Sequence, residues 1–216
     1  MKNKYNVLVS ASLMVMLAAG LIVGGTYALF SDSVKVSNHL KAGNLNISLL
    51  RTSYSKTTLD DNGYLTTVTD STVTDFTDAT DKNIFDIQDD EVIVPGSSFT
   101  ANMKLVNGKL NGSEYVASST AFQYDVKLDI DEESDEELLS QMMVTINKGS
   151  ELVVNKKLSE FTDDTIFSDT MTKNDAYQEF SVKLDFSDLT SAENNLAQDQ
   201  KANFDLIIEA IQLTSK

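Results

Sequence analysis

The chain has 216 residues, 33 acidic and 17 basic, with a formal net charge of −16 at pH 7. Nucleic acids and anionic membrane surfaces repel a chain of this charge, so we expect neither as a partner. The absence of cysteine and the presence of a single histidine exclude disulfides, thiolate metal sites and the usual two-histidine zinc site.

The N-terminus has the layout of an export signal. Two lysines precede an apolar block at residues 7–23, and small residues follow it as far as Ala28. We expect a signal peptidase to cleave between Ala28 and Leu29, which removes residues 1–28, a signal helix. The block of 17 residues is close to the length that crosses a bilayer of ~30 Å, so an uncleaved membrane anchor is the alternative. The membrane is otherwise not an expected partner.

Alternation of apolar and polar residues predicts β-strands along the rest of the chain. In chain order, the alternating segments are residues 45–49, 99–105, 122–130, 143–147, 152–156 and 180–186, of which 143–147 and 152–156 form a hairpin around Lys148-Gly149-Ser150. The last segment, residues 204–213, is apolar at most positions, which predicts a strand covered on both faces.

Three stretches do not alternate. Residues 51–83 are rich in Thr, Ser and Asp, and we expect a long excursion there with weak strands near residues 64–68. Residues 131–137 predict a helical turn that leads into Leu138 and Leu139, and residues 187–201 predict a short helix. With turn residues between the strands, the sequence predicts an all-β, antiparallel β-sandwich with short helical insertions.

The junction after the apolar block and the first strand carry a family resemblance. The segment Gly24-Gly25-Thr26-Tyr27-Ala28-Leu29-Phe30-Ser31-Asp32 is followed by Ala42-Gly43-Asn44-Leu45-Asn46-Ile47. This combination resembles the TasA/camelysin family of exported biofilm-matrix and cell-surface proteins, which a SipW-type signal peptidase processes. Val94-Pro95-Gly96 and the closing apolar strand add weaker support.

The resemblance implies a jelly-roll domain and a mature N-terminal segment that acts as a donor strand in the next subunit. The expected organisation is a signal peptide (1–28), a donor segment (29–40) and a jelly-roll domain (41–216). The donor residues would be Leu29, Phe30, Val34, Val36 and Leu40.

The pattern of the donor segment agrees with that role. Phe30, Val34, Val36 and Leu40 share one face of an extended chain. Burial of these four side chains contributes about 6–12 kcal/mol, against a cost of association of about 4–15 kcal/mol. Backbone pairing along an open sheet edge must therefore supply the rest. The alternative is that residues 29–40 pair within their own domain or stay disordered.

Catalysis is not expected. Some members of the family carry a metalloprotease label, but the lone His39 cannot form a zinc site of the usual kind. No cofactor is expected either. The acidic clusters leave calcium as an alternative, although none has the spacing of a helix-loop-helix calcium loop. These clusters are Asp60-Asp61-Asn62, Asp89-Asp90-Glu91, Asp131-Glu132-Glu133 and Asp135-Glu136-Glu137.

The function expected from the sequence is that of a secreted structural subunit of biofilm-matrix fibres on a Gram-positive cell surface. Its expected partners are further copies of itself in a homopolymer, an accessory matrix subunit and the signal peptidase. The alternatives are a monomeric surface or spore-associated protein and a camelysin-like metalloprotease, of which the sequence favours the metalloprotease less.

Overall fold

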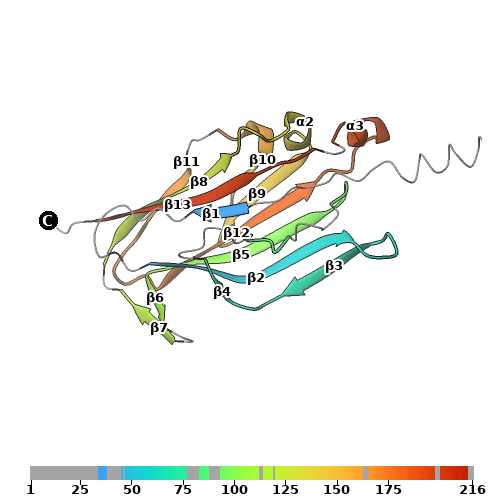
Figure 1. The fold of residues 1–216 in the computed structure, drawn as a ribbon. Helices are drawn as coiled ribbons and strands as arrows, with labels where there is room; N and C mark the ends of the chain where they lie inside the picture. The colour runs from blue at the N-terminus through green and yellow to red at the C-terminus, as the bar shows by residue number, and fades with distance from the viewer. Residues whose placement is uncertain are drawn as a thin grey trace, which may run out of the picture.

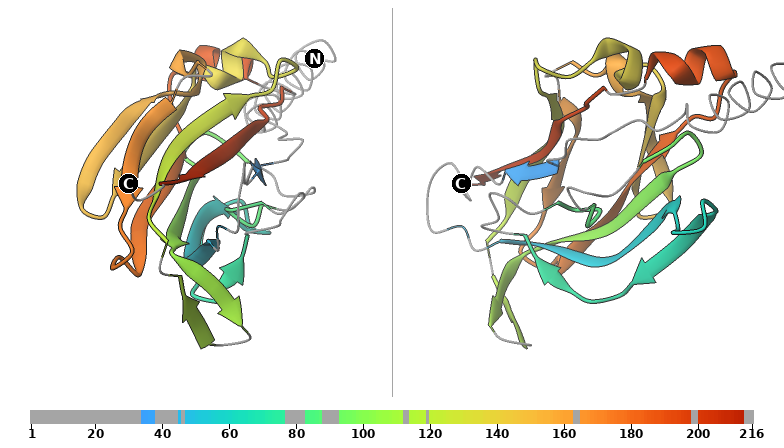
Figure 2. Two further views of the ribbon diagram at one scale, coloured as in Figure 1. Left: turned by 90° about the vertical axis from the view of Figure 1, so that its left-hand side faces the viewer. Right: turned by 45° about the vertical axis from the view of Figure 1, so that its right-hand side comes forward.

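The computed structural model describes residues 34–37, 45, 47–76, 83–87, 93–111, 114–118, 120–162, 165–197 and 200–213. They form two packed β-sheets, with short helices at one end and a small hairpin arm at the other (Figures 1 and 2). The elements are β1 (Val34–Ser37), β2 (Ser48–Leu59), β3 (Leu65–Asp70), β4 (Thr74–Asp75), β5 (Ser98–Val106), β6 (Gly108–Asn111), β7 (Glu114–Ala117), β8 (Phe122–Ile130), α2 (Glu136–Leu139), β9 (Met142–Lys148), β10 (Glu151–Lys157), the 3₁₀ helix η1 (Leu158–Glu160), β11 (Thr165–Met171), β12 (Tyr177–Phe186), α3 (Ser191–Leu196) and β13 (Phe204–Gln212). The predicted all-β sandwich is confirmed.

The first sheet has four strands in the order β1-β13-β8-β11. The second has seven, in the order β10-β9-β12-β5-β2-β3, with β4 also paired to β2. Strands β6 and β7 form the separate arm. Among the described pairs, all are antiparallel except that of β1 with β13.

The core lies between the sheets, because alternate residues of each strand point inward. In β5, Phe99, Ala101 and Met103 are buried, whereas Asn102 between them is exposed. Strands β8, β9, β12 and β13 show the same two-residue burial pattern. The alternation seen in the sequence thus marks the inner faces of both sheets.

The structure differs from the sequence prediction in three places. Strand β2 continues through Leu59, where an irregular excursion was expected, because residues 51–59 pair with β5 on one side and with β3 and β4 on the other. Strand β11 and the β6–β7 arm were not predicted. The closing strand is covered on one face only, since Ile211 is 57% exposed.

The short helices follow the prediction closely. Helix α3 begins after Thr190, whose hydroxyl accepts a hydrogen bond from the Glu193 amide while the Glu193 carboxylate accepts one from Thr190. This capping box satisfies amide donors at the helix start. Helix α2 lies where the sequence predicted a helical turn leading into Leu138 and Leu139, and the structure buries both leucines. Over the described residues, no helix has the length and apolar character needed to cross a membrane.

Candidate functional site

The edge of the four-stranded sheet is formed by β1, which lies parallel to β13. Val34 is the partner of Phe204, and the register continues to Ser37 opposite Ile207. On its other side, β13 pairs with β8 over all nine of its residues. Strand β1 therefore lines only the first four residues of β13, and residues 208–212 have no strand on that edge among the described residues.

This edge borders the core. Phe204, Leu206, Ile208 and Ala210 alternate along β13 and are at most 3% exposed. The outer side of the strand is polar at its centre, where Glu209 forms a 2.8 Å ion pair with Lys127 of β8. The hydrogen bond to Glu209 raises the pKa of Lys127, so the lysine keeps its charge above neutral pH. A strand added at this edge meets an apolar inner face and a charged outer face.

The predicted donor residues are only partly within the described chain. Val34 and Val36 lie in β1, in register with the core residues Phe204 and Leu206. Leu29, Phe30 and Leu40 lie outside the described residues, as does the predicted cleavage site between Ala28 and Leu29. Pairing within the same chain is the alternative that the sequence left open for this segment. The alternation of residues 34–37 indicated a strand, but no sequence signal indicated its parallel partner.

A second structural feature is the segment 83–87, which three side chains of β2 hold against the sheet. Arg51, the single arginine of the chain, is 5% exposed. Its Nη1 donates to the carbonyl oxygens of Asn83 (3.3 Å) and Ile84 (3.0 Å). The guanidinium lies over the rings of Tyr54 and Phe76, at 4.5 and 5.4 Å from their centroids. One buried cation thus binds two successive carbonyl groups of this irregular segment.

Asp86 supplies two further contacts between this segment and β2. The Tyr54 hydroxyl donates to Oδ2 of Asp86 at 2.9 Å, and Lys56 Nζ donates to the Asp86 carbonyl oxygen at 3.0 Å. Burial, followed by the hydrogen bond to Asp86, raises the pKa of Tyr54. Asp86 adopts a φ of 59°, a left-handed conformation in which aspartate is tolerated better than most residues. No local sequence pattern indicates this cluster. The only hint in the sequence is that Arg51 is the single arginine of the chain.

In the first acidic cluster, Asp60 accepts the hydrogen bonds of a turn. Asp60 Oδ1 accepts hydrogen bonds from the amides of Asn62 and Tyr64, both at 2.9 Å. The hydrogen bond from the Tyr64 amide is the main cause of the lowered pKa of Asp60. Its carboxylate therefore shapes the β2–β3 hairpin turn, in which Gly63 adopts a φ of 78°.

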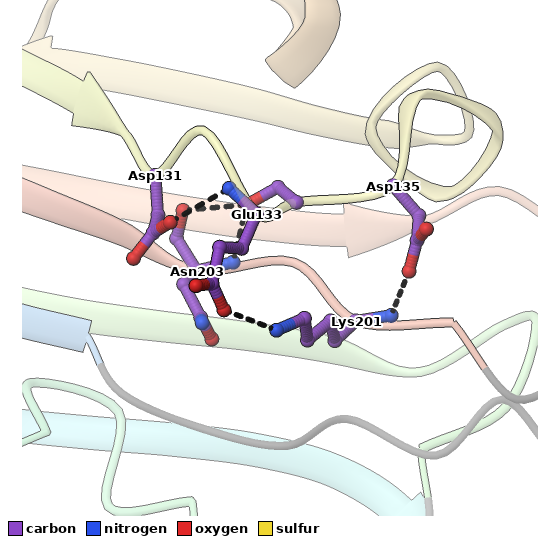
Figure 3. Close-up of polar contacts among 6 residues, drawn as sticks. Asp131, Glu133, Asp135, Lys201 and Asn203 are labelled. Carbon is purple, nitrogen blue, oxygen red and sulfur yellow. Dashed lines mark hydrogen bonds and ion pairs between the residues drawn. The ribbon is translucent and has the colours of Figure 1, made fainter.

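Figure 3 shows how the acidic residues after β8 are used. Asp131 Oδ1 accepts from the Glu133 amide at 2.8 Å, and Asp135 Oδ2 accepts from the Lys201 amide at 2.8 Å. The Lys201 ammonium lies 2.7 Å from Glu133 Oε2, and this hydrogen bond raises the pKa of the lysine. The three carboxylates thus bind protein donors, and those of Glu133 and Asp135 tie the loop after β8 to Lys201 in the segment before β13.

Metal-ligating groups do not converge within the described part of the chain. No group of three or more His, Cys, Asp or Glu residues there is arranged to hold a metal ion. The lone His39 and the predicted cluster Asp89-Asp90-Glu91 lie outside the described residues.

Comparison with known proteins gives one match. The model of the family described as camelysin metallo-endopeptidase matches residues 2–54. The matched range contains the junction and the first-strand motif from which the resemblance was inferred, and it confirms that resemblance. No curated protein matches the chain. No solved structure matches it either.

Proposed function

From the premise that residues 2–54 match the camelysin family, we propose that the chain is a secreted structural subunit of extracellular matrix fibres. In this proposal a signal peptidase cleaves between Ala28 and Leu29. The freed N-terminal segment then leaves its own sandwich and pairs with β13 of the next subunit. Repetition of this step gives a homopolymer at the cell surface, to which an accessory matrix subunit can add.

The observation that carries the proposal is the short parallel pairing of β1 with β13. Both strands lie near chain ends in sequence, and only four residues of β1 pair with the nine-residue β13. A terminal strand at a sheet edge can exchange between copies because the same backbone hydrogen bonds form in either arrangement. Strand β1 of one copy can therefore pair with β13 of another copy through the same backbone hydrogen bonds.

Exchange between subunits also permits a longer pairing. If the register of β1 continues in a neighbouring subunit, residues 38–42 meet residues 208–212, and Leu40 stands opposite the buried Ala210. Five paired residues at these positions, each contributing a fraction of a kcal/mol or more, would stabilise the pairing between chains. This extension gives Leu40 a role in the donor segment.

The proposal is tested with protein exported by a Gram-positive host. N-terminal sequencing should begin at Leu29, and negative-stain microscopy should show filaments. Deletion of residues 29–38 should leave a folded monomer, as measured by circular dichroism and light scattering. Filaments of normal number and width from the truncated chain would refute the donor-strand assembly.

Point variants provide a matched control for the deletion. Val34→Asp with Val36→Asp places two carboxylates at the register positions of Phe204 and Leu206 and should abolish filaments. Ser33→Asp with Ser37→Asp changes the net charge equally but spares these positions, and should leave filaments intact. Equal loss in both double variants would indicate a charge effect instead of strand pairing.

We propose a structural function in place of catalysis because the chain has a single histidine, although the family's description names a metallo-endopeptidase. A catalytic zinc site requires three protein ligands, most of them histidine in known proteases. Homogeneous protein should therefore cleave no unstructured substrate such as casein. Cleavage that a chelator abolishes and added Zn²⁺ restores would establish the peptidase instead.

A further inference from the structure

Strand β3 is exposed on both faces. Its first five residues, 65–69, are all exposed. It pairs with β2 over six residues, and it ends the seven-stranded sheet with no strand on its outer edge among the described residues. Figures 1 and 2 show it at the outer margin of the sandwich. Its outer row of amides and carbonyls is available for pairing.

Two of the other edge strands, β10 and β11, carry features that hinder strand addition. Strand β10 has a register shift between Leu152 and Val154 and three charged residues. Strand β11 has a register shift between Thr165 and Phe167. Bulges and edge charges of this kind block pairing with another chain. Strand β3 has neither, because its register is unbroken and its one charged residue is Asp70, at its end.

Exposed apolar side chains gather at the same edge. Eleven large apolar side chains of the described residues are exposed, and four of them lie within ten residues of one another. These four are Tyr64 (72%), Leu65 (47%), Val68 (49%) and Val73 (55%). Two come from a short repeat, Thr67-Val68-Thr69-Asp70 and Thr72-Val73-Thr74-Asp75. Leu65 and Val68 lie on opposite faces of β3 because side chains alternate along a strand, so both faces of this edge expose apolar side chains, as interaction surfaces do.

We propose that β3 pairs antiparallel with β3 of a second copy and so joins two seven-stranded sheets edge to edge. A two-fold axis through the pair places a residue opposite its own copy, either Thr67 or Val68. Asp70 then faces Tyr64 or Thr66 of the other chain, so the like charges stand apart. A parallel arrangement would put Asp70 beside Asp70, which disfavours it.

The neighbouring sheet surface is compatible with a second copy. Next to β3, the outer face of the sheet carries uncharged polar residues that alternate with the buried Tyr54 and Ala101. These residues are Ser53, Ser55, Thr57, Thr100 and Asn102. Joining the edges therefore brings together few like charges, despite the net charge of each chain. Inside a fibre, this contact would be lateral, and it does not depend on donor-strand exchange.

Cysteine cross-linking of the full exported chain tests this pairing directly, because the natural chain has no cysteine. Opposed residues of antiparallel strands have Cα atoms about 4.5–5.5 Å apart, within the range that a disulfide spans. Mild oxidation should therefore give a disulfide-linked dimer for Thr67→Cys or Val68→Cys. Leu152→Cys, on the edge strand β10 and 58% exposed, should give none. If neither β3 variant exceeds Leu152→Cys in dimer yield, the pairing is wrong.

A pair of charge variants measures the contribution of the edge to association. Val68→Glu and Leu152→Glu each add one negative charge, and Glu at position 68 lies opposite Lys56, which favours retention of the hairpin. In sedimentation equilibrium, Val68→Glu should weaken dimerisation at least tenfold, whereas Leu152→Glu should leave it unchanged. Equal weakening by both variants would overturn the proposal, and unchanged melting temperatures would show that both remain folded.

Discussion

Tyr124 of β8 places a hydroxyl group in the core without a hydrogen-bond partner among the described residues. The side chain is 1% exposed, and its ring contacts those of Phe122 and Phe167 at centroid distances of 6.2 Å. Burial, with a smaller contribution from the Asp169 carboxylate, raises the pKa of Tyr124. A raised pKa means that the folded state favours the neutral phenol more than the unfolded chain does.

The pH dependence of stability follows from this shift. The contribution of the Tyr124 pKa shift to the free energy of unfolding is fully present below the pKa of the unfolded chain, about 10, and is lost as the pH rises from there toward the pKa of the folded state. Tyr124→Phe should therefore reduce the fall in melting temperature between pH 9 and pH 11. At pH 7 it should raise the free energy of unfolding by about 1 kcal/mol, because a buried hydroxyl without a partner is removed. The control Tyr177→Phe, at a residue 52% exposed, should change neither quantity; a fall in stability on Tyr124→Phe would show that the hydroxyl is satisfied in solution.

At the scale of elements, the segment 83–87 is placed by contacts with β2 and β5. Ile84 and Phe85 are fully buried, the Phe85 ring lies 6.0 Å from that of Phe99 in β5, and backbone carbonyl groups of the segment accept hydrogen bonds from Arg51 and Lys56 of β2. A planar guanidinium can donate to two carbonyl oxygens and lie flat against aromatic rings, whereas an ammonium group cannot do both. The segment therefore requires arginine at position 51.

Arg51→Lys should lower the free energy of unfolding by about 2 kcal/mol, since it removes hydrogen bonds of about 1 kcal/mol each and part of the ring contact. Chemical denaturation provides the measurement. Lys56→Met removes one hydrogen bond from the same segment and should cost less than half as much. Hydrogen exchange of the residue 84 and 85 amides should quicken in Arg51→Lys before global unfolding. Equal costs for the two variants would show that Arg51 has no special role.

The elements also show which signals in the sequence were informative. Strands β5, β8 and β12 were predicted because each has one face in the core and alternates accordingly, whereas β13 was predicted from an apolar run. The second half of β2 was not predicted, and β3 was predicted only as a weak strand near residues 64–68, because most of their threonine and serine side chains are not buried and give no alternation of apolar and polar residues. Helix α3 was predicted in place, since its capping residues act locally.

At the scale of the whole molecule, net charge governs association. Both proposed contacts bring together chains that, without residues 1–28, each have 15 basic and 33 acidic residues and a net charge of −18, so repulsion opposes them at low salt. An increase in ionic strength from 0.01 to 0.15 M shortens the Debye length from about 30 to about 8 Å. The rate of assembly, measured by light scattering, should therefore rise at least several-fold. Slower assembly at the higher salt concentration would indicate that attractive ion pairs dominate the contacts.

The sequence by itself determined the all-β class, the inner faces of the strands, the short helices and the family resemblance of the first 54 residues. These follow from periodicity, capping and local motifs, which act over a few residues. Only the tertiary structure decided that Val34–Ser37 lies parallel to β13, that Arg51 fastens residues 83–84, and that β3 is an open edge. Each of these features depends on which segments, distant in sequence, become neighbours in space. Local sequence patterns do not determine this, because the packing of the two complete sheets decides which strands pair.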